Sequence, residues 1–95
     1  MDLKEISTLK DKYATDWQLT HNSTRLNKAL RFKNFKHPFN LMVKIGNMAE
    51  EVKHHPDFKL GWGYLEIEIT THSIQGLTQA DFELASKIDD ILTDK

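Results

Sequence analysis

The sequence predicts an α+β fold with the element order α-β-β-α-β-β-α, in which a four-stranded antiparallel sheet carries three helices on one face. Two observations lead to this prediction. Apolar residues recur at helical spacing in three segments, and they alternate with polar residues in short segments between them. The short segments come as two consecutive pairs, and two such hairpins pack most simply as one antiparallel sheet. A chain of 95 residues leaves little room for a second core, so we expect a single domain over residues 1–95.

The first third of the chain predicts a helix followed by a hairpin. The helix is expected over roughly residues 2–12, a strand over residues 17–20, a turn at residues 21–23 and a second strand over residues 26–32. The apolar residues behind this assignment are Leu3, Ile6, Leu9 and Tyr13 in the helix and Leu26, Leu30 and Phe32 in the second strand.

A longer helix is predicted to begin at Phe35. Asn34 can cap its N-terminus, and Pro38 falls in the first turn, where a missing backbone N–H costs least. The helix is expected to end at His55, because Pro56 disfavours a helical conformation for the residue before it.

Two apolar rows cover this helix, which is more than contact with one sheet requires. They are Phe35, Phe39, Met42, Gly46 and Ala49, and Leu41, Ile45, Met48 and Val52. The helix is therefore either deeply buried at the centre of the domain or carries a subunit interface on its flank.

The second half predicts another hairpin. Residues 57–60 lead into a glycine-flanked bend at residues 61–63. From Leu65 onward, apolar and polar residues alternate, which indicates a half-buried strand. His72 is expected at the carboxyl end of this strand, on the parity opposite to the core residues.

A last helix is predicted to follow, starting at a capping-box variant formed by Thr78 and Asp81. Leu77 and Phe82 occupy the positions of a hydrophobic staple at the same end. The helix is expected to continue to about Leu92. Its inward-facing residues are Phe82, Ala85, Ile88 and Leu92.

Composition excludes several functional classes. The formal net charge of −1 gives no overall electrostatic attraction to nucleic acid or to an anionic membrane. Cysteine is absent, which excludes disulfides, thiolate nucleophiles and thiolate metal sites. The longest apolar runs are far below a membrane span, and the acidic start of the chain lacks the character of a signal peptide. We therefore expect a cytoplasmic protein with no membrane and no direct nucleic-acid partner.

Three histidines, His54, His55 and His72, are the candidate catalytic residues. Histidine has the unperturbed pKa nearest neutrality, so converging imidazoles can donate and accept protons at cellular pH. We expect the three rings to meet around one small cavity. Glu50 lies one turn before His54 and can hold its tautomer. Asp81 either orients His72 or is a plain helix cap.

Other chemistry is less well supported by the sequence. Glu51 and His54 match half of a di-iron motif, but the second motif and the further glutamates are missing, so no metal is expected. Trp62 and Tyr64 either stack on a flat heterocycle or pack over the sheet. A basic segment, comprising Arg25, Lys28, Arg31, Lys33 and Lys36, is better explained by charges that keep strand edges apart than by phosphate contacts.

With these motifs in place, the sequence resembles the pterin-4a-carbinolamine dehydratase family. The resemblance is carried by Glu50-x-x-x-His54-His55-Pro56, Trp62, Thr71-His72, Gly76-Leu77-Thr78 and Asp81, and weaker similarity covers nearly the whole chain. The chain departs from the family pattern at three positions. Lys53 stands where Asn is frequent, and Lys28 and Leu30 stand where Arg and Phe are frequent.

The resemblance implies dehydration of the 4a-carbinolamine that forms when aromatic amino acid hydroxylases oxidise a tetrahydropterin, without any cofactor. It implies catalytic roles for His54, His55 and His72. Within that reaction, our hypothesis makes His54 and His72 the acid–base pair, lets His55 and Trp62 bind the pterin, and gives Glu50 and Asp81 supporting roles.

The resemblance also implies assembly as homodimers or homotetramers. An aromatic amino acid hydroxylase would be a functional partner. A non-catalytic alternative remains, because the resemblance implies that some members are dimerisation cofactors of transcription factors.

Overall fold

The computed structural model describes residues 1–93 and confirms the predicted order of elements. The helices and strands are α1 (Leu3–Tyr13), β1 (Gln18–Thr20), β2 (Arg25–Arg31), α2 (Lys36–Val52), β3 (Asp57–Gly61), β4 (Tyr64–Ile69) and α3 (Gln79–Thr93). A short 3₁₀ turn, η1 (His72–Ile74), lies between β4 and α3. The four strands form one antiparallel sheet in the order β1-β2-β4-β3.

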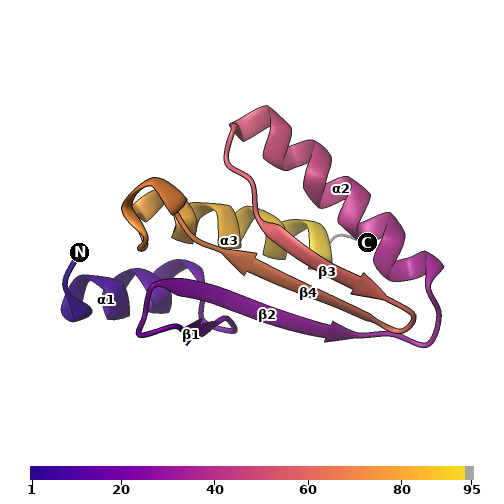
Figure 1. The fold of residues 1–95 in the computed structure, drawn as a ribbon, viewed down its shortest axis with the longest axis horizontal. Helices are drawn as coiled ribbons and strands as arrows, with labels where there is room; N and C mark the ends of the chain where they lie inside the picture. The colour runs from indigo at the N-terminus through magenta and orange to yellow at the C-terminus, as the bar shows by residue number, and fades with distance from the viewer. Residues whose placement is uncertain (94–95) are drawn as a thin grey trace.

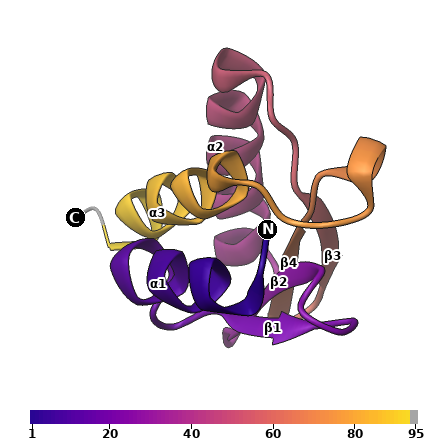
Figure 2. The same cartoon turned by 90° about the vertical axis from the view of Figure 1, so that its left-hand side faces the viewer.

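The three helices cover one face of the sheet, as predicted (Figures 1 and 2). Strand alternation explains why: Leu65, Ile67 and Ile69 of β4 are fully buried, whereas Glu66 and Glu68 face away from the helices. Each buried apolar side chain of this size contributes roughly 1.5–3 kcal/mol to folding. The other large core residues are Trp17, Leu26, Ile45, Phe82, Leu84 and Ile88.

The first helix follows its prediction to within one residue. Asp2 caps α1 by accepting a hydrogen bond from the backbone N–H of Glu5, and the Glu5 carboxylate accepts one from the backbone N–H of Asp2. This capping box satisfies N–H groups that have no partner inside the helix.

The long helix α2 begins close to its predicted start but ends three residues before the predicted end. The side chain of Asn34 accepts a hydrogen bond from the backbone N–H of His37 at 2.9 Å, and Phe35 occupies the N-cap position. The predicted end at His55 is wrong, because Lys53 adopts a left-handed conformation with φ of 57° and closes the helix at Val52. His54 and His55 therefore lie outside the helix.

The predicted strand that ended at His72 also stops early. β4 ends at Ile69, and Thr71 makes an isolated bridge with Gly76. This bridge closes a small loop that contains η1, so His72 lies in the 3₁₀ turn instead of a strand. Gln75 adopts a left-handed conformation with φ of 50° at the end of the turn.

The interpretation of α2 as a deeply buried helix is wrong for the single chain. Only Pro38, Ile45 and Ala49 of α2 are buried. Phe35, Phe39, Val43 and Val52 are between 40% and 46% exposed, and the rings of Phe35 and Phe39 stack with centroids 5.9 Å apart. We call Phe35, Phe39 and Val43, which recur at every fourth residue, the α2 apolar stripe; Val52, nine residues after Val43, lies on the opposite side of the helix from it.

Within residues 1–93, none of the helices has the length and apolar character needed to cross a membrane.

Candidate active site

The candidate site lies where four segments meet at one end of the sheet. Antiparallel pairing of Asp57 with Glu68 places the start of β3 beside the end of β4. The residues that follow α2 and those that follow β4 are therefore neighbours, and the N-terminus of α3 packs close to both. These segments supply all three candidate histidines.

His54 lies against a buried carboxylate at the start of α3. Its Nε2 is 2.8 Å from Oδ1 of Asp81, whose side chain is fully buried, while the His54 side chain is 21% exposed. The contact lacks the geometry of a hydrogen bond, so Oδ1 has no hydrogen-bond partner within the described residues. The imidazole lies directly against this buried oxygen, and its protonated form would compensate the burial of the negative charge.

The other oxygen of Asp81 serves as a helix cap. Oδ2 accepts hydrogen bonds from the backbone N–H of Thr78 at 2.8 Å and from the hydroxyl of Thr71 at 2.7 Å. The cap prediction is therefore confirmed. The prediction that Asp81 orients His72 is wrong, because Thr71 fills that side of the carboxylate and His72 contacts a different acid.

His55 pairs with Glu50 on the surface. Nε2 of His55 lies next to Oε2 of Glu50, and the two side chains are 59% and 76% exposed. The expectation that Glu50 contacts His54 is wrong, because the left-handed turn at Lys53 ends the helical register that would have brought His54 one turn after Glu50.

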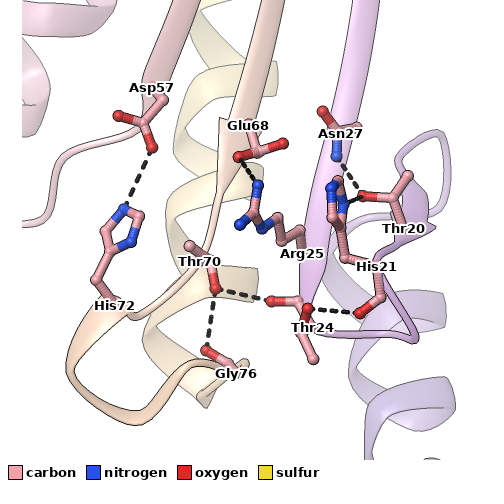
Figure 3. A network of polar contacts seen from close by, with 10 residues as sticks. All are labelled: Thr20, His21, Thr24, Arg25, Asn27, Asp57, Glu68, Thr70, His72 and Gly76. Atoms are coloured by element: carbon pink, nitrogen blue, oxygen red, sulfur yellow. Dashed lines mark hydrogen bonds and ion pairs between the residues drawn. The ribbon is translucent and has the colours of Figure 1, made fainter.

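His72 pairs with Asp57, a residue that sequence reasoning missed. Nε2 of His72 is 3.3 Å from Oδ2 of Asp57, and both side chains are more than 60% exposed (Figure 3). The available signal was positional: Asp57 begins the strand that pairs with β4, two residues after His55. A carboxylate there necessarily lies beside the residues that follow β4.

Each of the three imidazoles thus has its Nε2 next to a different carboxylate. The hydrogen bonds to carboxylates fix the ring orientation of His55 and His72 and leave Nδ1 of each available to a reactant, whereas His54 has only the close contact with Asp81. Within residues 1–93, Nδ1 of His54, His55 and His72 makes no hydrogen bond. The arrangement can therefore hold three proton-exchanging groups at one end of the sheet.

His54 and His72 line two different hollows in the single chain, whereas the sequence predicted one cavity shared with His55. His72 lines an open hollow of about 490 Å³ together with Thr24, Arg25, Thr70 and Gln75. His54 lines a separate hollow of about 100 Å³ between the end of α2 and α3. The side chains of neighbouring Thr71 and His72 point to different partners, and this separates the two hollows.

Trp62 does not join the histidines. It lies in the turn between β3 and β4, and its side chain is 71% exposed. The strand residues from Asp57 to Gly61 separate it from the histidine end of the sheet, a length of roughly 13 Å at 3.3 Å per residue. Within one chain Trp62 therefore lies apart from His55, and the predicted binding of one pterin by both would need a neighbouring chain to supply Trp62.

In the described part of the chain, no group of three or more His, Asp or Glu side chains is arranged to hold a metal ion.

The small α+β fold and its carboxylate–imidazole pairs can be compared with known proteins. The family model for pterin 4 alpha carbinolamine dehydratase matches residues 1–91. The chain therefore belongs to the pterin 4 alpha carbinolamine dehydratase family.

Individual relatives agree with this assignment. A protein of Rickettsia bellii named "Putative pterin-4-alpha-carbinolamine dehydratase" is 40% identical over 94% of this chain and 78% of its own length. A protein of Methylococcus capsulatus with the same name is 40% identical over 79% of this chain and 66% of its own length. The chain thus spans about two thirds to three quarters of these relatives.

Two solved structures share the fold. A "transcriptional coactivator/pterin dehydratase" from Brucella melitensis has a TM-score of 0.84 at 24% identity, covering 96% of each chain. A "pterin dehydratase-like protein", described as a RuBisCO assembly factor in the alpha-carboxysome, has a TM-score of 0.70 at 17% identity, covering 87% of this chain and 96% of its own. At these identities the likeness concerns the fold alone.

Proposed function

We propose that the protein is a lyase that eliminates water from a 4a-hydroxytetrahydropterin to give a quinonoid dihydropterin, by histidine acid–base catalysis. Family membership supports the dehydratase chemistry. The observation that carries the catalytic proposal is the placement of three carboxylate-paired imidazoles at one end of the sheet.

The reaction needs one group that donates a proton and one group that accepts a proton. The C4a hydroxyl leaves and N5 loses a proton, so the C4a–O bond breaks while a C4a=N5 double bond forms. Hydroxide is a poor leaving group, and an imidazolium that donates a proton to it releases water instead. A neutral imidazole accepts the proton from N5. Each positioned acid or base of this kind contributes roughly 10²–10⁴-fold to the rate.

We assign the two proton transfers to His54 and His72 and binding of the polar edge of the pterin to His55. The support for this assignment is that Nε2 of His54 lies next to the carboxylate of Asp81, and Nε2 of His72 lies next to the carboxylate of Asp57. Asp81 and Glu50 support the site by positioning His54 and His55. The pterin then has to reach the hollow lined by His72 and the hollow lined by His54. Contact of one pterin with all three rings is therefore the central structural requirement of the proposal.

A stopped-flow assay tests this function. The 4a-hydroxytetrahydropterin is generated chemically, and its conversion is followed by absorbance with and without the protein. The proposal predicts a clear acceleration over buffer. No acceleration at any protein concentration would contradict it and would favour the alternative, a non-catalytic dimerisation or transcriptional-cofactor module.

The α2 apolar stripe supports a further part of the proposal, self-association into a homodimer or homotetramer. Three exposed apolar side chains that recur at every fourth residue, with the rings of Phe35 and Phe39 stacked, are the kind of contiguous apolar surface that marks an interface. Sedimentation of the wild type and of Phe39→Glu tests this, because a charge on the stripe should lower the oligomer mass. An unchanged mass would place any interface elsewhere.

The proposed cellular role is tetrahydrobiopterin recycling in the cytoplasm, in support of an aromatic amino acid hydroxylase. The carbinolamine produced by such a hydroxylase is the substrate that this chemistry consumes. Disruption of the gene in a cell that depends on the hydroxylase should then slow regeneration of tetrahydropterin.

A further inference from the structure

Building on the proposed dehydratase function, we propose that Arg25 and Glu68 are specificity-determining residues that bind an uncharged, hydroxylated side chain at carbon 6 of the pterin. Neither residue belongs to the three histidine–carboxylate pairs. Both lie on the face of the sheet that the helices leave open, next to the hollow that His72 lines.

The hollow has the size of a small-molecule site. Its volume of about 490 Å³ falls in the range of about 300–1,000 Å³ that is typical of ligand pockets. The residues around it are Thr24, Arg25, Thr70, His72 and Gln75, all of them polar. A ligand whose reacting atoms lie near His72 therefore extends its remaining parts toward Arg25.

The floor of the hollow is held in place by Thr70, which is only 6% exposed. Its hydroxyl lies 2.7 Å from the carbonyl oxygen of Thr24 and 3.3 Å from that of Gly76 (Figure 3). These contacts tie the loop between β1 and β2 to the loop after β4. The two rims of the hollow are thus positioned before any ligand binds, which reduces the entropic cost of binding.

The rims also contain backbone conformations that are uncommon for residues other than glycine. His21, Asn22 and Ser23 have φ values of 52°, 57° and 62°, and Gln75 has a φ of 50°. Such conformations persist where surrounding contacts hold them, and they are concentrated at functional sites. Here the hydroxyl of Thr24 donates to the carbonyl of His21 at 2.6 Å and stabilises the rim formed by the loop between β1 and β2.

Arg25 and Glu68 offer both donors and acceptors to a ligand. Nη1 of Arg25 donates to Oε1 of Glu68 at 2.9 Å, and the side chains are 37% and 24% exposed. Arginine has five N–H donors, and this is the one side-chain bond that its guanidinium makes within residues 1–93. Figure 3 shows the guanidinium between Glu68 and the side of the hollow where Thr70 and His72 lie.

A hydroxyl group both accepts and donates hydrogen bonds, so a hydroxylated chain can accept from Arg25 and donate to Glu68. A negatively charged chain fits less well, because the carboxylates of Glu68 and Asp57 lie at the same end of the sheet and would repel it. A single ion pair that is partly exposed to solvent adds little to folding stability, so removal of the Arg25–Glu68 pair should leave the fold intact.

The test compares two chemically generated 4a-hydroxytetrahydropterins, one with a dihydroxypropyl chain and one with a methyl group at carbon 6. Arg25→Ala is expected to lower kcat/KM for the dihydroxypropyl substrate by roughly tenfold, the effect of losing one hydrogen bond to a charged group. For the methyl substrate, kcat/KM should stay unchanged.

Arg31→Ala is the matched control. Arg31 lies on the same strand and on the same parity as Arg25, but six residues further along, and it is exposed. Its removal changes the net charge equally and should leave both substrates unaffected. Glu68→Ala should reproduce the selective loss, and the double variant with Arg25→Ala should add little to it, because the two residues act as one unit.

The possible failures are distinguishable. Equal losses on both substrates in Arg25→Ala, or no loss on either by an active protein, would overturn the specificity proposal alone. If the wild type accelerates neither substrate, the dehydratase proposal falls and this inference falls with it. Equilibrium binding of the corresponding stable 7,8-dihydropterins, followed by fluorescence, should show the same selective weakening in Arg25→Ala.

Discussion

His54 and His72 lie at the same end of the sheet and each contacts an aspartate, but the two pairs differ in burial. Asp81 is fully buried and also caps α3, whereas Asp57 and His72 are both exposed. A buried carboxylate that loses its partner costs much more free energy than an exposed one. The burial of Asp81 makes its pair with His54 part of the fold, whereas the exposed pair of His72 and Asp57 can serve the proposed chemistry without supporting the fold.

The largest effect is expected from Asp81→Ala. The variant loses the helix cap and the acceptor for Thr71, so the free energy of unfolding should fall by about 3 kcal/mol. Urea denaturation measures the change, and Asp90→Ala, an exposed aspartate on the same helix, is the control. A loss below about 1 kcal/mol would contradict the role of the buried pair.

His54→Ala should lower both stability and turnover. It leaves Oδ1 of Asp81 buried without the imidazole that lies against it, which costs roughly 1–3 kcal/mol. Turnover should fall at least tenfold, the lower end of what a positioned acid or base contributes. His54→Gln should recover part of the stability but not the turnover. If His54→Gln kept near-normal turnover, the proton-transfer role would be refuted.

His72→Ala should separate the two properties. Because the pair with Asp57 is exposed, stability should change by no more than about 0.5 kcal/mol, while turnover falls at least tenfold. His37→Ala, which removes an exposed histidine from the start of α2, is the control. A His72→Ala protein with unchanged turnover would remove this ring from the mechanism.

His55→Ala is expected to raise KM more than it lowers kcat. The ring and its partner Glu50 are both exposed, so the fold should not respond. Steady-state kinetics with the same substrate distinguish the two parameters. A fall in kcat with KM unchanged would mean that His55 transfers a proton and that our assignment of the three rings is wrong.

The smallest effect is expected from Trp62→Ala. The side chain is exposed at the opposite end of the β3–β4 hairpin, so turnover and KM should match the wild type. A large rise in KM would show that Trp62 reaches a substrate, which would require a neighbouring chain to bring it there.

The sequence predicts the elements well because alternation and helical spacing directly reflect which face of each strand and helix is buried. The sequence does not predict where α2 and β4 end, and the positions of these two ends shape the site. The left-handed conformation of Lys53 and the bridge between Thr71 and Gly76 depend on contacts made only in the folded chain. An early end to α2 and to β4 changes the direction of every histidine that follows.

The carboxylate partners show the same limit. Local spacing assigned Glu50 to His54 and left Asp57 unnoticed, whereas the fold pairs Glu50 with His55 and Asp57 with His72. Sequence separation is a good guide within a helix, but these partners meet across strands and loops. The histidines of the candidate site could therefore be chosen from the sequence, but the carboxylate that contacts each ring could not.

NMR of the histidine rings during titration with a stable 7,8-dihydropterin tests the central requirement most directly, with His37 at the start of α2 as the internal reference. We predict that the ring signals of His54, His55 and His72 all shift with one common affinity while the His37 signal stays in place. Movement of the His72 signal alone, with His54 and His55 unaffected, would contradict a shared site.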